Sequence, residues 1–148
     1  MKKWIALILA AVLVCAFAGC KEKRTAEHKG GMVGKKSTYD ISHTLMIDFK
    51  GEDKKTEEII LEIQNPLDVQ CAYGYGYVIE VLTDGEWYTT QYGAPDTPAG
   101  VYVIEPGEIK EHSYKLFNEP PAGTYRLVLL GVYVGVEKSC VAAEFTLE

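Results

Sequence analysis

The amino-acid sequence predicts an all-β domain, a sandwich of seven to eight antiparallel strands. Apolar and polar residues alternate with a period of two along most of the chain after residue 40, as in half-buried strands. Turn signals recur at intervals of about 8–12 residues, and no segment after the N-terminal leader has the 3.6-residue period of an amphipathic helix. Short strands at regular spacing are typical of two packed sheets.

Residues 1–19 are expected to be a lipoprotein signal peptide. Two lysines precede the apolar run Trp4–Ala18, which is shorter than a membrane span. Phe17-Ala18-Gly19-Cys20 resembles a bacterial lipobox, in which small residues precede a lipidated cysteine. The resemblance implies cleavage before Cys20 and a lipid anchor of several acyl chains on the extracytoplasmic face of the cell membrane. An ordinary secretory signal or an uncleaved anchor is the alternative.

Residues 20–40 are expected to form the lipidated N-terminus and a flexible tether, because charge is dense and no apolar period is visible. Six Lys or Arg residues and two Glu residues give Cys20 to Lys36 a net charge of +4, which either favours anionic headgroups or belongs to a simple spacer. Residues 41–148 are then one domain. From Ile59 onward, four Lys or Arg residues stand against thirteen Asp or Glu residues, and this net charge of −9 argues against nucleic acid as a partner.

The first two strands are expected at residues 43–49 and 58–65. In each strand every second residue is apolar and belongs to one face. These residues are Leu45, Ile47, Phe49, Ile59, Leu61 and Ile63. A polar turn at 51–55 separates the strands, and Asn65-Pro66 ends the second one.

Residues 75–90, YGYVIEVLTDGEWYTT, are expected to form a hairpin. Its first arm places Tyr77, Ile79 and Val81 on one face. Asp84-Gly85 is a strong signal for a type I′ turn, in which both central residues have positive φ. Gly74 and Gly76 allow a bend or bulge where this arm begins.

Four further elements complete the predicted domain. Residues 92–100 are rich in turn residues and predict a loop. Residues 101–116 predict a strand, a Pro106-Gly107 turn of type II character and a second strand. The most apolar segment, 119–135, predicts a central strand, and 139–148 alternates as a last strand.

In chain order, these strands fit an immunoglobulin-like β-sandwich. Tyr125 stands early in a strand after a corner, two residues before the core position Leu127, which is typical of a tyrosine corner whose hydroxyl bonds the preceding loop. An ordinary strand aromatic is the alternative for Tyr125. The two cysteines of antibody domains are absent from the corresponding strands, so we expect a sandwich without that inter-sheet disulfide.

Five blocks of sequence between Leu61 and Leu147 resemble the bacterial Ig-like domain of small exported lipoproteins of Firmicutes type. The blocks are LEIQNP, YGYGYVIEVLTDGEWY, IEPGEIKEHSYKL, PAGTYRLV and AAEFTL. The resemblance implies an Ig-like sandwich with no catalytic residues and no cofactor. It implies little about molecular function, because a fold does not supply one.

The residues themselves also predict no enzyme. His28, His43 and His112 have no second ligand at metal-binding spacing. No Gly-rich phosphate loop opens a helix, and no nucleophile has a base nearby in the sequence. We therefore expect neither a metal site nor a cofactor.

Cys71 and Cys140 would both remain after leader cleavage in an exported protein, where disulfides persist. In the expected topology the strands that begin at these cysteines flank one central strand, and both start near its end. Strands that flank a third lie about twice 4.8 Å apart, whereas direct pairing needs Cα atoms within about 7 Å. We expect a disulfide in which one cysteine lies in a loop folded over that end; two separate thiols are the alternative.

The leading functional hypothesis is a non-catalytic binding or envelope accessory role, with an unidentified envelope protein or ligand as partner. The expected contact surfaces are loop ends, one formed by Gln70–Tyr75 with Val134–Ser139 and another by Tyr92–Tyr102. Exposed aromatic residues there would mark binding, and buried ones packing. The candidate binding residues are Tyr73, Tyr75, Trp87, Tyr88 and Tyr92. The last three define the alternative, a carbohydrate or small-ligand binding module.

Overall fold

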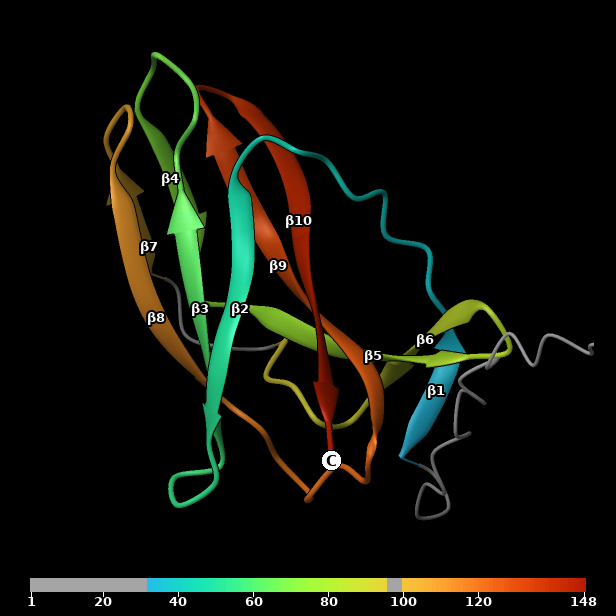
Figure 1. Ribbon diagram of the computed structural model, residues 1–148. Helices are drawn as coiled ribbons and strands as arrows, with labels where there is room; N and C mark the ends of the chain where they lie inside the picture. The colour runs from blue at the N-terminus through green and yellow to red at the C-terminus, as the bar shows by residue number, and fades with distance from the viewer. Residues whose placement is uncertain (1–31, 96–99) are drawn as a thin grey trace, which may run out of the picture.

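A computed structural model describes residues 32–95 and 100–148, which form ten antiparallel strands in two sheets and no helix (Figure 1). The strands are β1 (Val33–Lys36), β2 (Met46–Asp53), β3 (Glu58–Gln64), β4 (Cys71–Gly74), β5 (Tyr77–Thr83), β6 (Glu86–Thr90), β7 (Val101–Ile104), β8 (Ile109–Lys115), β9 (Gly123–Val134) and β10 (Glu137–Leu147). The smaller sheet has the order β2-β3-β8, and the larger has β1-β6-β5-β9-β4-β7 with β10 on β9. The predicted all-β sandwich is therefore confirmed.

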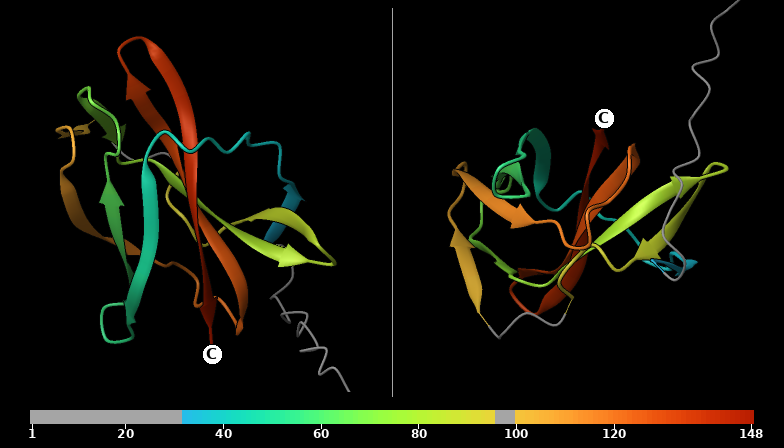
Figure 2. Two further views of the ribbon diagram at one scale, coloured as in Figure 1. Left: turned by 45° about the horizontal axis from the view of Figure 1, so that its top comes forward. Right: turned by 90° about the horizontal axis from the view of Figure 1, so that it is seen from below.

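The number of strands is larger than predicted because one expected strand is interrupted. β4 and β5 both pair with the same side of β9, with Tyr73 opposite Val132 and Tyr77 opposite Leu129. Four residues on one strand thus span three on the other, which is the mark of a β-bulge. The predicted bulge beside Gly74 and Gly76 is confirmed. On the side away from β9, the two halves of the interrupted strand have different neighbours: β7 lies beside β4, and β6 lies beside β5 (Figure 2).

The second extra strand lies in the segment expected to be a tether. β1 pairs with β6, with Val33 opposite Thr90 and Lys36 opposite Tyr88. The Ser37 amide donates to the Trp87 carbonyl over 2.7 Å and continues this pairing. Ordered structure therefore begins before residue 40. Cys20 and the predicted signal peptide lie outside the described residues.

The core lies between the two sheets, and the alternation in the sequence selects its residues correctly. Ile59, Leu61 and Ile63 of β3 are fully buried, as are Ile79 and Val81 of β5. The rings of Phe49 and Phe145 stack at 5.5 Å and pack β2 against β10. Burial of this apolar surface is the main contribution to the stability of such a domain.

Three local predictions from turn chemistry are confirmed. Asp84 and Gly85 have φ values of 51° and 81°, as a type I′ turn requires. Gly107 has φ 72°, and the Glu108 amide bonds the Glu105 carbonyl at 3.0 Å, which closes the Pro-Gly turn. The Tyr125 hydroxyl donates to the Pro121 carbonyl at 2.6 Å, as expected of a tyrosine corner.

One end of the sandwich collects several connections and is called the loop end below. It comprises the start of β2, the β3–β4 loop, the β7–β8 turn and the β9–β10 turn, which lie together at the top of Figure 1. The β7–β8 turn carries the chain from the larger sheet to the smaller one, because β7 pairs with β4 and β8 pairs with β3. The turn thereby ties the two sheets together at this end.

Candidate functional site

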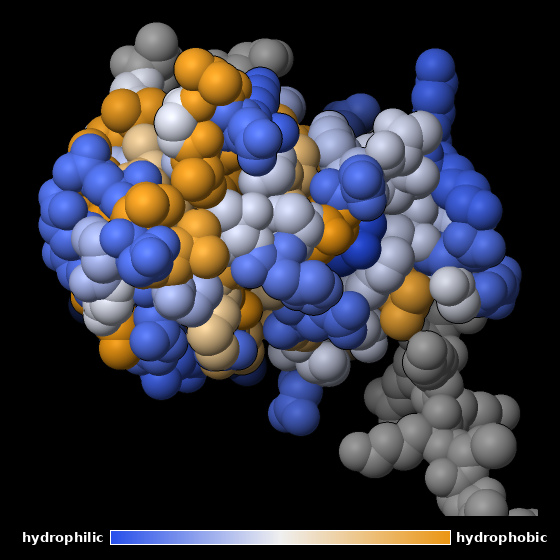
Figure 3. All heavy atoms as spheres, turned by 90° about the horizontal axis from the view of Figure 1, so that it is seen from above, coloured by the Kyte–Doolittle hydropathy of each residue, from blue (hydrophilic) through white to orange (hydrophobic). Residues whose placement is uncertain are grey.

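Exposed hydrophobic side chains concentrate at the loop end. Seven large hydrophobic side chains are clearly exposed in residues 32–95 and 100–148, and four of them lie in this end or at the first residue of the strand that leaves it. They are Met46, Val69, Ile109 and Val136, and we call them the apolar patch. Figure 3 views this end, and its hydrophobic residues gather on the half over β3, β4, β7 and β8 rather than over β5 and β6. Single exposed apolar residues are ordinary, whereas a cluster of them makes this end the candidate interaction site.

The sheet register fixes part of this patch. Met46 lies opposite Gln64, and Gln64 lies opposite Ile109, so these residues form one row across β2, β3 and β8. Residues in one row of an antiparallel sheet point to the same face. Met46 and Ile109 therefore stand on the outer face of the smaller sheet, on either side of Gln64. Val136, in the β9–β10 turn, is 99 % exposed.

Asn65 holds the loops of this end together. Its buried side chain donates from Nδ2 to the Val69 carbonyl at 2.8 Å and to the Ile104 carbonyl at 3.1 Å. Its Oδ1 accepts from the Leu67 amide at 3.0 Å, and its own carbonyl accepts from Gly107 at 2.9 Å. A buried, fully bonded amide of this kind fixes the β3–β4 loop against the β7–β8 turn. From the sequence we expected only that Asn65 ends a strand.

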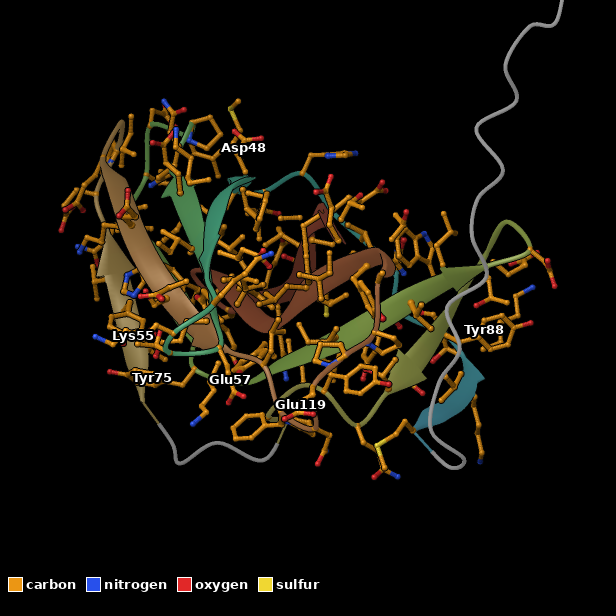
Figure 4. The ribbon with its side chains drawn as sticks, turned by 60° about the horizontal axis from the view of Figure 1, so that its bottom comes forward. Asp48, Lys55, Glu57, Tyr75, Tyr88 and Glu119 are labelled. Carbon is orange, nitrogen blue, oxygen red and sulfur yellow. The ribbon has the colours of Figure 1, made fainter. Side chains whose placement is uncertain are left out.

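Carboxylates outnumber lysines near the apolar patch. The charged residues of this end include Asp48, Asp68, Glu105, Glu108, Glu137, Lys110 and Lys138, and these seven carry a net charge of −3. Lys110 Nζ lies 3.4 Å from Glu108 and donates to the Val103 carbonyl at 2.7 Å. The Glu105 amide and Lys110 both hydrogen-bond Glu108 and lower the pKa of its carboxyl, so it stays charged at neutral pH. Asp48 points outward from β2 near this end (Figure 4).

The aromatic residues singled out from the sequence do not form one binding surface. Tyr73 and Tyr92 are buried, and Tyr92 packs edge-on against Tyr125 at 6.1 Å. Tyr75 and Tyr88 lie on opposite sides of the molecule (Figure 4). The expectation that Tyr73 and Tyr92 contribute to binding is therefore wrong: their side chains point into the sandwich, where they pack.

Trp87 and Tyr88 also fail to form the stacking platform that a sugar-binding module needs. As neighbours in β6, their side chains point to opposite faces. The guanidinium of Arg126 lies over the Trp87 ring, 4.6 Å from its centroid, and occupies that face. Together with the burial of Tyr92, this arrangement removes the geometric basis of the carbohydrate alternative.

The expected disulfide between Cys71 and Cys140 is not formed, and both cysteines are free thiols. Cys71 lies on β4 and Cys140 on β10, which flank β9 on opposite sides. Two strand spacings, about 9.6 Å, exceed the reach of a disulfide. No loop folds over to close this gap, since Cys71 contacts Asn65 Oδ1 and Cys140 contacts the Leu130 carbonyl.

Cys140 lines an open groove of about 530 Å³ between the 38–42 segment and the first half of β10. Its surroundings do not activate it as a nucleophile. Burial first, and then Asp40 and Glu80, raise the pKa of its thiol, against the opposing effect of Lys138. Because the thiolate is the reactive form, this environment makes Cys140 a slow nucleophile near neutral pH.

His112 lies among aromatic rings, 4.2 Å from Tyr102 and 5.5 Å from Tyr73 between centroids. Burial lowers the pKa of its imidazole. A hollow of about 200 Å³ at the opposite end is lined largely by carboxylates, including Glu57 and Glu119. Within residues 32–95 and 100–148, no set of three His, Cys, Asp or Glu side chains is placed to hold a metal ion. Those residues also include no helix long and apolar enough to cross a bilayer.

Comparison with known proteins gives one family and one structural likeness. A family model described as a bacterial Ig-like domain matches residues 40–146. No curated protein matches the chain. Among solved structures, the ASH / PapD-like domain of human CEP192 (PapD-like domain 7) is similar, with 16% identity and a TM-score of 0.35. The match covers 81% of this chain and 94% of that one.

Proposed function

Because the chain belongs to the bacterial Ig-like domain family, we propose that it is a non-enzymatic lipoprotein that binds a partner protein through the loop end. The lipid on Cys20 anchors it to the extracytoplasmic face of the cell membrane. The apolar patch supplies the contact surface. The concentration of exposed apolar side chains at this one end carries the proposal.

The internal hydrogen bonds that order the loop end support a binding role. Asn65 fixes Val69 and the β7–β8 turn before any partner arrives. A surface that is already ordered loses little conformational entropy on association. Loops held on a rigid scaffold are also where binding residues of sandwich domains are commonly found.

The position of the N-terminus also supports this role. The described chain enters at Met32, and β1 lies beside β6, on the side of the molecule away from β7 and β8 (Figure 1). The first described residues therefore lie away from the β7–β8 turn and do not cover the apolar patch.

The anchor is tested by metabolic labelling of the full chain with radioactive palmitate in a bacterial host. Wild-type protein should incorporate label and fractionate with membranes. Cys20→Ser should lose the label, whereas Cys15→Ser, the matched cysteine within the apolar run, should keep it. Labelling that survives Cys20→Ser would contradict the anchor.

The binding role is tested by photocrosslinking in cells of the source organism, with a photoreactive amino acid at Val69. A specific adduct is expected in wild type. Val136→Asp should abolish it, because the substitution places a charge in the apolar patch. Phe117→Asp, an equivalent change at an exposed apolar residue of the β8–β9 connection, should leave it intact. Equal loss in both variants, or no specific adduct, would contradict the binding role.

A further inference from the structure

We propose that the protein bound at the loop end presents an apolar surface surrounded by lysine or arginine residues. This inference rests on the proposed binding role and adds the chemistry of the partner. It follows from the charges near the apolar patch, which include five carboxylates and two lysines.

The protein itself leaves much of this negative charge unneutralised. Among the described residues, Asp48, Asp68 and Glu137 form no ion pair. Lys110 is already engaged by Glu108 and by the Val103 carbonyl. Lys138 stands 5.9 Å from the Tyr133 ring centroid and pairs with no described carboxylate. Lysine or arginine residues around the partner's apolar surface would therefore meet carboxylates that have no ion pair. Acidic residues at the same positions would be repelled.

The same charges disfavour two other occupants. A second copy of this chain would bring the carboxylates around one apolar patch against those around the other. Each like-charge contact of this kind costs free energy. A bilayer rich in anionic lipid would be repelled for the same reason. A basic partner protein is the occupant that matches both the apolar patch and its surroundings.

The two parts of the site should act on different steps of binding. Exposed charges at the edge of an interface mainly change the association rate and its salt dependence. Apolar residues at its centre mainly change the lifetime of the complex. Reversing one carboxylate should therefore weaken capture at low salt and have less effect at high salt.

The test measures the yield of the Val69 photocrosslink in membranes at about 50 mM and about 500 mM NaCl. Glu137→Lys should lower the yield about threefold or more at low salt and much less at high salt. Glu148→Lys is the matched control, because it makes the same change at the other end of β10 and should have no effect. Mass spectrometry of the adduct should place lysine or arginine residues near the crosslinked position of the partner.

The outcomes separate the two proposals. Specific capture that is equal or stronger with Glu137→Lys overturns the basic partner but leaves the binding role standing. An adduct with a second copy of this chain also overturns the basic partner. So does flotation of the Cys20→Ser protein with phosphatidylglycerol vesicles if Val136→Asp abolishes the flotation, because that dependence assigns the vesicle contact to the apolar patch. Absence of any specific adduct in wild type overturns the binding role itself.

Discussion

Arg126 donates from Nε to Glu80 Oε2 across 2.6 Å, and the Glu80 side chain is completely buried. The pair lies on the face of the larger sheet opposite the core. There the guanidinium packs on the Trp87 ring and donates from Nη2 to the Ser37 hydroxyl at 3.3 Å. The N-terminal segment, the β6 strand and the central β9 strand thus meet at one ion pair.

Removal of Arg126 should destabilise the domain strongly. Arg126→Leu leaves the Glu80 carboxylate buried without its counter-ion, and we expect a loss of about 3–5 kcal/mol in the free energy of unfolding. Replacement of both residues by leucine should cost much less, because no charge remains buried. Urea denaturation followed by tryptophan fluorescence measures both. A single variant no less stable than the double one would contradict this account of the pair.

The sequence could predict the face of Glu80 but not its burial. Alternation along β5 places the side chain of Glu80 on the face of the sheet away from Ile79 and Val81, and the structure agrees. Its burial depends on Trp87 from the same hairpin and on Arg126 and Ser37, which are distant in sequence and have no periodic signal of their own. The polar, charged composition of residues 20–40 predicts a tether. Residues 33–36 nevertheless form a strand, because their backbone pairs with β6 and backbone hydrogen bonds do not require apolar side chains.

The sequence locates the candidate site but misses most of its residues. It indicates the loops around Gln70–Tyr75 and Val134–Ser139, and the apolar patch lies partly in and partly beside them. Tyrosines are natural candidates there because aromatic residues dominate many interfaces. The parity of β4, however, directs Tyr73 into the core. Val69 and Val136 carry no motif, so only the structure reveals their exposure.

Gly93 should resist substitution because it packs directly on backbone. A Cβ at this position would lie 2.8 Å from Ile79 N and 3.0 Å from Val78 Cα. Backbone of β5 cannot move aside easily, and we expect Gly93→Ala to cost about 1–3 kcal/mol in thermal or urea unfolding. Gly51→Ala is the control, since a Cβ at residue 51 would meet nothing within 4 Å. Equal stability of the two variants would show that the 91–95 segment does not pack closely against the backbone of β5.

The cysteines should behave as two separate thiols. Alkylation of the denatured protein without reductant, followed by peptide mass mapping, should modify both Cys71 and Cys140. In the native protein, Cys71 should be protected because it is buried. Cys140 should react slowly at pH 7 and faster above the ordinary thiol range of about 8.5, because its pKa is raised. A cystine-linked peptide pair from unreduced protein would contradict the structure.

Four core tyrosines should make the domain sensitive to alkali. Burial raises the pKa of Tyr77 to about 12, and it raises those of Tyr73, Tyr114 and Tyr125 as well. The ordinary value is about 10. The folded state therefore holds these protons more tightly than the unfolded state. Their contribution to stability is complete below about pH 10 and is lost as pH rises toward the raised values.

Absorbance of phenolate near 295 nm should consequently rise in two stages. Exposed tyrosines should ionise first, and the buried ones only as the domain unfolds, which circular dichroism records in parallel. Tyr73→Phe should weaken the alkaline loss at little cost at pH 7, because this buried hydroxyl has no hydrogen-bond partner among the described residues. Tyr77→Phe should instead cost about 1 kcal/mol at pH 7, since its hydroxyl donates to the Lys115 carbonyl at 2.6 Å. Ionisation of all ten tyrosines in one step near pH 10, with the fold intact, would contradict the burial that the structure assigns to them.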